Sequence, residues 1–167
     1  MGIQQILLVA LVAIVVGIAT ILAINIFEAQ AKKNHQDQLK IQMLEIVGNV
    51  IAYRYKPESM GGGGGSLLGY MPPGGEDNPR SGSDQDDRHF VKFSNDLATF
   101  FVELYDADWD DIAVKIIASS AIYGDQHPFP ANAGNARITA CFNQYGSLHT
   151  GPGFCPDVPG FAIDGSW

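Results

Sequence analysis

The chain has 167 residues and a formal net charge of −8, which leaves room for one globular domain beside a long apolar segment. The charge is uneven, because residues 58–167 hold fifteen acidic and five basic side chains, whereas residues 1–57 hold three acidic and five basic ones. Binding to phosphate backbones needs a basic surface, so this acidic portion argues against a nucleic-acid partner.

Residues 1–27 carry no charged side chain and predict a membrane-spanning helix. The stretch 3–24 is apolar except for two glutamines, a glycine and a threonine. At about 1.5 Å per residue, such a helix is about 33 Å long, enough to cross a bilayer core of about 30 Å. A secretory signal normally opens with basic residues, which are missing here. We therefore expect either a leader that has been removed or a role of this segment beyond targeting.

Residues 28–56 predict an amphipathic continuation of the same helix. Apolar side chains recur there at helical spacing, namely Leu39, Met43, Ile46, Val47 and Val50. Pro57 is the first proline of the chain, so the helix is expected to end just before it. Gly17 and Gly48 are its weak points, each costing up to about 1 kcal/mol relative to alanine.

Residues 57–88 form a Gly/Pro-rich segment that predicts an irregular surface loop. It contains five consecutive glycines at 61–65, but no Lys-Ser or Lys-Thr pair follows them. A phosphate-binding loop is therefore disfavoured.

Residues 89–167 predict a small α+β head. A short helix is expected after Ser94 as N-cap, with Leu97, Phe100, Phe101 and Leu104 on its apolar face. Strands are expected at 89–93, 112–116, 136–142 and 161–163. The predicted fold class is thus α+β, with one long N-terminal helix packed against a small antiparallel sheet.

Cys141 and Cys155 are the two cysteines of the chain, with thirteen residues between them. A chain directed to a membrane for export favours a disulfide that closes this loop, worth about 3 kcal/mol. Two unpaired buried thiols are the alternative.

The run from Asp106 has the D-x-D-x-D pattern that begins a calcium loop, with Asp108 and Asp110 as the further candidates. However, Asp111 stands where that loop needs glycine, and Ile117 stands where it needs glutamate. We expect a solvated acidic turn rather than a metal site.

The four histidines have no ligand spacing, and neither a Gly-x-Ser-x-Gly motif nor a carboxylate pair suited to acid–base work stands out. The sequence therefore predicts a protein that is not an enzyme and has no cofactor.

Taken together, the apolar start, the bilayer-length helix with its amphipathic second half, the variable loop, the small sheet and the C-terminal cysteine loop resemble a type IV pilin. The resemblance is strongest over residues 1–55 and includes the amphipathic stretch 41–55. It implies removal of a short basic leader and N-methylation of Met1.

The resemblance also implies a structural role. Before assembly the chain would be anchored in the inner membrane. It would then interact with a pilus assembly machinery and form a homo-oligomeric helical filament at the cell surface. Assembly would use the terminal Met1, Gln4 and Gln5, together with the apolar helix surface of Ile3, Leu7, Leu8, Leu11, Ile14, Gly17, Ile18 and Ile21.

Two positions depart from the family pattern. Gln5 stands where pilins usually have a glutamate that neutralises the terminal amine of a neighbour, and Leu22 stands where many have proline. Two other functions stay open: a minor pilin or pseudopilin of a secretion or DNA-uptake system, and a monomeric periplasmic binding domain held by a membrane anchor.

Overall fold

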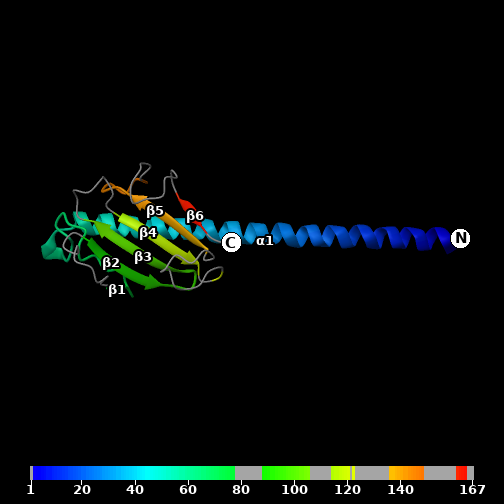
Figure 1. Cartoon of the computed structure of the whole chain (residues 1–167), viewed down its shortest axis with the longest axis horizontal. Coiled ribbons are helices and arrows are strands. Elements are labelled where there is room, and N and C mark those ends of the chain that lie inside the picture. Colours follow the sequence, from blue (N-terminus) through cyan, green and yellow to red (C-terminus); the bar gives the residue numbers. More distant parts are fainter. Residues whose placement is uncertain are drawn as a thin grey trace. The chain divides into compact units, whose positions relative to one another are not determined.

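The computed structural model describes residues 2–77, 88–105, 114–120, 122, 136–148 and 161–164. They form the helix α1 (Gly2–Tyr55), the short 3-10 helix η1 (Glu58–Met60), and the strands β1 (Glu76–Asp77), β2 (Arg88–Ser94), β3 (Ala98–Tyr105), β4 (Val114–Ser120), β5 (Arg137–Phe142) and β6 (Ala162–Asp164) (Figure 1). The chain divides into two compact units, residues 1–37 and residues 38–167.

The helix α1 runs without interruption through Gly17 and Gly48 and ends at Tyr55, two residues before Pro57. A single helix that continues from the apolar half into the amphipathic half is therefore confirmed. A Cβ atom added at either glycine would meet nothing within 4 Å, so neither glycine is needed for packing within the chain.

The five glycines at 61–65 turn back toward the C-terminus of α1 and the residues just after it. Their N–H groups donate to backbone carbonyls of residues 53–58, namely Gly61 to Glu58, Gly62 to Pro57, Gly63 to Tyr53, Gly64 to Lys56 and Gly65 to Arg54, at 2.9 to 3.1 Å. Two of these acceptors, Tyr53 and Arg54, belong to the last turn of α1, whose carbonyls lack partners inside the helix, so Gly63 and Gly65 supply partners that water would otherwise have to provide. The prediction of an irregular surface loop at 57–88 is thus correct only in part, because the segment also contains η1 and β1, and Leu67 and Tyr70 are buried in the core.

The six strands of the described residues form one antiparallel sheet in the order β1-β2-β3-β4-β5-β6, each strand beside its neighbour in sequence (Figure 1). One face of the sheet shares a core with the amphipathic part of α1. The helix contributes Leu39, Met43, Ile46, Val47 and Val50, and the strands contribute Val91, Phe100, Val102, Leu104, Val114, Ile116, Ile138, Ala140 and Phe142.

The helix expected after Ser94 is wrong, because residues 98–105 form the strand β3. Asn95 instead makes the turn between β2 and β3, where its Oδ1 accepts the N–H groups of Leu97 at 3.0 Å and Ala98 at 2.9 Å. An Asn or Ser before an apolar run favours a helix N-cap and a side-chain-stabilised turn alike, since the local hydrogen bond is similar.

The strands β2, β4, β5 and β6 agree with the predicted strands, whereas Ile112 lies outside the described residues. All eight residues of β3 are buried, so this strand is covered on both faces. The face opposite α1 carries Phe101, Glu103 and Tyr105, each 7% exposed.

Candidate functional site

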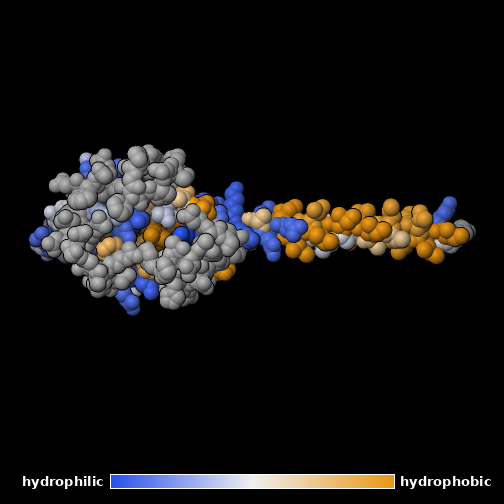
Figure 2. Space-filling view, in the orientation of Figure 1, coloured by the Kyte–Doolittle hydropathy of each residue, from blue (hydrophilic) through white to orange (hydrophobic). Residues whose placement is uncertain are grey.

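The apolar half of α1 has a hydrophobic surface on every side. The side chains of Ile3, Leu7, Leu8, Leu11, Ile14, Ile18 and Ile21 are 56% to 84% exposed in the isolated chain. Figure 2 shows this surface as an almost unbroken hydrophobic segment of the helix. Among the described residues, α1 is the one helix long and apolar enough to cross a membrane.

Thr20 and Gly17 interrupt the aliphatic side chains of this segment, and both fit an apolar environment. The Thr20 hydroxyl donates to the carbonyl oxygen of Val16 at 2.8 Å, so it makes a hydrogen bond within the helix itself. Gly17 leaves open space beside the backbone. Small residues of this kind let a second helix approach closely.

The first turn of α1 contains the exposed residues Gln4 and Gln5 and no acidic side chain. The first N–H groups of a helix lack partners inside it, and carboxamide oxygens can accept from such donors or from an ammonium group. An amide does not cancel a positive charge, however, so Gln5 cannot replace the effect of a glutamate. Met1 lies outside the described residues.

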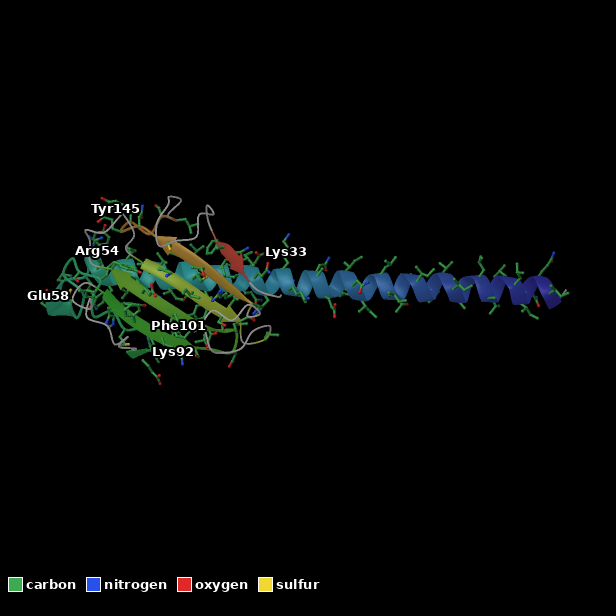
Figure 3. The ribbon with its side chains drawn as sticks, viewed as in Figure 1. Lys33, Arg54, Glu58, Lys92, Phe101 and Tyr145 are labelled. Carbon is green, nitrogen blue, oxygen red and sulfur yellow. The ribbon has the colours of Figure 1, made fainter. Side chains whose placement is uncertain are left out.

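Charged residues begin at Glu28 and mark the end of the apolar surface. Lys33 is exposed and is labelled in Figure 3, and Lys32 is partly buried. His35 is 6% exposed, and this burial lowers the pKa of its imidazole below the usual value of 6.5.

The head contains a pocket of about 280 Å³ between α1, the loop after η1, and the β2–β3 hairpin. Tyr70 lines it, is 7% exposed, and packs edge-on against Tyr53 with ring centroids 5.6 Å apart. Burial raises the pKa of the Tyr70 hydroxyl above its usual value of 10.0. This pocket was not predicted from the sequence, because its walls come from segments far apart in the chain.

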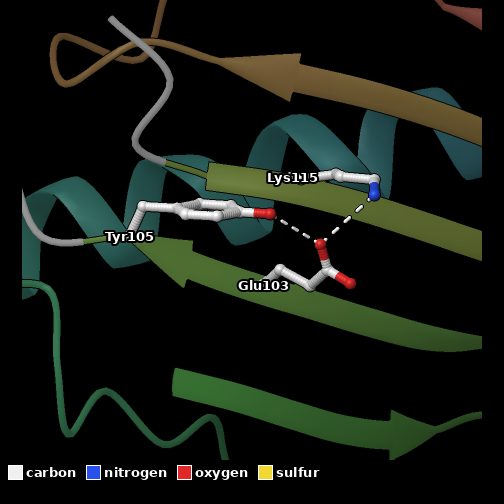
Figure 4. Close-up of polar contacts among 3 residues, drawn as sticks. All are labelled: Glu103, Tyr105 and Lys115. Carbon is white, nitrogen blue, oxygen red and sulfur yellow. Dashed lines mark hydrogen bonds and ion pairs between the residues drawn. The ribbon is translucent and has the colours of Figure 1, made fainter. Parts of the chain in front are cut away.

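The sheet face opposite α1 holds a buried polar network (Figure 4). Glu103 and Lys115 lie directly across from each other on β3 and β4, with Lys115 Nζ 3.2 Å from Glu103 Oε2. The Tyr105 hydroxyl donates to the same oxygen at 2.8 Å. Lys92 Nζ lies 5.8 Å from the centroid of the Phe101 ring on the same face. These pairs could be found from the sequence only once the strand register was known.

Arg54, which is labelled in Figure 3, lies at the end of α1 and contacts the turn after β5. Its Nε donates to the carbonyl oxygen of Gly65 at 2.8 Å, and its terminal nitrogens lie 3.3 Å from Gln144 Oε1. A guanidinium near the last helical carbonyls also suits the negative end of the helix dipole.

Cys141 is 2% exposed and takes part in a disulfide, so its thiol is not free. Its predicted partner Cys155 lies outside the described residues, as do Asp106, Asp108 and Asp110. No cluster of three or more His, Cys, Asp or Glu side chains able to hold a metal ion occurs in the part of the chain that the structure describes.

Comparison with models of protein families, with curated proteins and with solved structures finds no significant match to this chain. The architecture of one long apolar N-terminal helix with an antiparallel sheet is compatible with a pilin-like fold, and the apolar helix could anchor the chain in a membrane.

Proposed function

We propose that this protein is the structural subunit of a type IV pilus-like filament, assembled by packing the apolar halves of α1 from many copies. The observation that carries the proposal is the charge-free helix surface of residues 2–27, which is exposed throughout in the isolated chain. Such a surface needs either lipid or other apolar helices around it.

The energetics favour an exchange between these two environments. Each large apolar side chain gains about 1.5–3 kcal/mol when it leaves water. Lipid tails and neighbouring helices both provide that gain, so a helix can pass from the membrane into a helical bundle without losing it. A head-to-tail contact that does not close on itself then produces an open filament.

The disulfide at Cys141 supports export of the head, because disulfides persist in oxidising compartments. In this proposal the chain is held in the inner membrane before assembly, Met1 carries N-methylation, and a pilus assembly machinery moves the chain into a filament at the cell surface.

The test is electron microscopy of sheared surface material from cells that produce the full chain. We expect regular fibres about 50–80 Å wide, from a central bundle of helices about 10–12 Å thick surrounded by heads. Fibres in which this chain is a trace component would correct the proposal to a minor pilin. Recovery of the chain as a membrane-bound monomer without fibres would instead favour an anchored binding domain.

A substitution separates helix packing from membrane anchoring. Gly17→Leu adds an apolar side chain where a Cβ meets nothing within 4 Å, so insertion into lipid should be unchanged. Close approach of a neighbouring helix should be lost, and the yield of fibres should fall at least tenfold. Ile18→Leu is the matched control, because it keeps the size of an exposed apolar side chain.

The Gln5→Leu variant tests for a polar contact at the helix start. An undiminished yield of fibres from this variant would rule out such a contact.

A further inference from the structure

The head pocket has one apolar side, built from aromatic and prolyl rings. Phe93 and Phe100 are cross-strand partners on β2 and β3, and their rings are stacked with centroids 5.0 Å apart and planes 14° apart. Phe100 is fully buried and Phe93 is half-buried. Pro72 and Pro73 line the pocket from the loop after η1. Phe100 and Pro72 are buried and support this side from behind, so Phe93 and the exposed Pro73 supply the accessible carbon surface that suits the C–H face of another ring.

The other side of the pocket is a polar edge supplied by α1. Gln42, Glu45 and Asn49 line it at i, i+3 and i+7, which places them on one helix face. Asn95 fixes the first of them, because its Nδ2 donates to Gln42 Oε1 at 3.1 Å. Asn95 is itself held, since its Oδ1 accepts the N–H groups at the start of β3.

This arrangement fixes which polar atoms remain for a ligand. With Oε1 of Gln42 occupied by Asn95, the Nε2 group of Gln42 is left as a donor. Asn49 offers a donor and an acceptor, and Glu45 offers a carboxylate acceptor. The lining contains one acidic side chain and no basic one, so the pocket disfavours anions.

We propose that this pocket binds a neutral pyranose sugar, as a single residue or as the end of a glycan. Sugar hydroxyls donate and accept at once, which matches the mixed edge of α1, and the C–H face of the sugar ring matches the accessible carbon surface of Phe93 and Pro73. An alkylammonium group can only donate hydrogen bonds. It would bind to the oxygen acceptors of Glu45 and Asn49 and leave the amide N–H donors of Gln42 and Asn49 without a ligand partner. The volume of about 280 Å³ lies just below the range of about 300–1,000 Å³ for drug-sized ligands, which suits one ring. The proposal is independent of the filament, since every residue used belongs to residues 38–167.

The test is proton–nitrogen correlation NMR of the full chain in dodecylphosphocholine micelles, a detergent without a sugar headgroup. The probes are the methyl glycosides of glucose, galactose, mannose and N-acetylglucosamine in the tens of millimolar range, with n-butylammonium and acetate for comparison. We expect at least one glycoside to shift the side-chain amide signals of Gln42 and Asn49 in a saturable manner, and acetate to shift neither. The absence of saturable shifts with every glycoside would overturn the proposal, as would saturation by n-butylammonium alone.

Two variants place the site. Asn49→Ala changes an exposed helix residue and should weaken binding of the glycoside by up to about tenfold, the usual effect of one lost hydrogen bond. Asn34→Ala, the same change at an exposed helix position outside the pocket, should leave the affinity unchanged. Gln42→Glu keeps an oxygen acceptor for Asn95 but removes the amide donor. It should therefore weaken the binding of the glycoside and strengthen the binding of n-butylammonium. Equal affinity in the wild type and in both pocket variants would overturn the assignment to this pocket.

Discussion

Glu103 is a carboxylate on a strand that is buried on both faces, and its two partners explain why the fold tolerates it. Lys115 supplies an opposite charge at 3.2 Å, and Tyr105 supplies a hydroxyl donor at 2.8 Å. Burying a charge without partners is costly, whereas a paired and hydrogen-bonded charge can be held. The three side chains therefore depend on one another, and the loss of one should affect the whole group.

Tyr105→Phe tests this dependence. The variant removes the hydroxyl that donates to Glu103 and keeps the buried ring, so we expect a loss of about 1.5–3 kcal/mol in the free energy of unfolding. Urea denaturation followed by near-ultraviolet circular dichroism measures this loss. Tyr145→Phe is the control, because Tyr145 is 69% exposed and its hydroxyl should contribute little. Equal destabilisation by the two variants would contradict the role of the Tyr105 hydroxyl.

The buried hydroxyl of Tyr70 should make the stability of the fold depend on pH in the alkaline range. Burial raises the pKa of its hydroxyl above 10.0, so in this range the folded chain keeps a proton that the unfolded chain releases. Stability is therefore unaffected by this group below pH 10 and falls as the pH rises from there through the folded pKa. Thermal melting of the wild type and of Tyr70→Phe at neutral and alkaline pH is the measurement. From neutral to alkaline pH, we expect Tyr70→Phe to lose less stability than the wild type. An identical loss in the two proteins would show that Tyr70 does not cause the alkaline destabilisation.

At the scale of elements, the end of α1 is fixed by the glycine run rather than by Pro57 alone. All five N–H groups of the run are bound to backbone carbonyls, which also leaves none of them to bind a phosphate. Glycine is required at specific positions. At Gly63 a Cβ atom would overlap the carbonyl oxygen of Ser66 and lie 2.8 Å from the Tyr53 ring. The run is thus a structural cap with a strict steric requirement.

Gly63→Ala and Gly48→Ala should have opposite effects. In Gly63→Ala the new methyl group pushes against the backbone of Ser66 and the ring of Tyr53, which should cost about 1–3 kcal/mol of stability. The second adds a Cβ atom into open space inside α1 and should stabilise the helix by up to about 1 kcal/mol. Thermal denaturation of both variants provides the comparison, and a neutral Gly63→Ala would show that the loop can move away from the helix end.

The elements that the sequence predicted correctly have a simple pattern. The helix could be recognised from its apolar spacing and its first proline, and β2, β5 and β6 from short runs of apolar and β-branched residues. The strand β3 could not, because Leu97, Phe100, Phe101 and Leu104 also fit a helical face. A strand buried on both faces has no alternation of apolar and polar residues, so its periodicity does not identify it.

Of the candidate sites, the apolar helix surface was visible in the sequence because it is local and continuous. The head pocket was not, since Gln42, Tyr70 and Phe93 meet only after the helix, the loop and the hairpin have folded. The Glu103–Lys115 pair depends in the same way on the register of β3 and β4.

For the whole molecule, the buried hydrophobic core is made by residues of the head, and the apolar segment adds nothing to it. The buried core begins at Leu39, and residues 2–27 contribute none of it. A chain that lacks residues 1–27 should therefore keep its fold, with a free energy of unfolding changed by less than about 0.5 kcal/mol, as for surface changes in general. Urea denaturation of the truncated and full chains in the same detergent tests this, and an unfolded truncated chain would contradict it.

The order of the strands also bears on how the head acquires its structure. Each strand pairs with the one before it in the chain, so every step of sheet formation closes only a loop to the preceding strand. Topologies dominated by such local pairing fold faster than those that join distant segments. The remaining long-range step is the docking of α1 residues 39–50 on the sheet, which covers its apolar face. Until that docking occurs, the new sheet would expose its apolar face, so we expect the head to be most prone to aggregate at this stage.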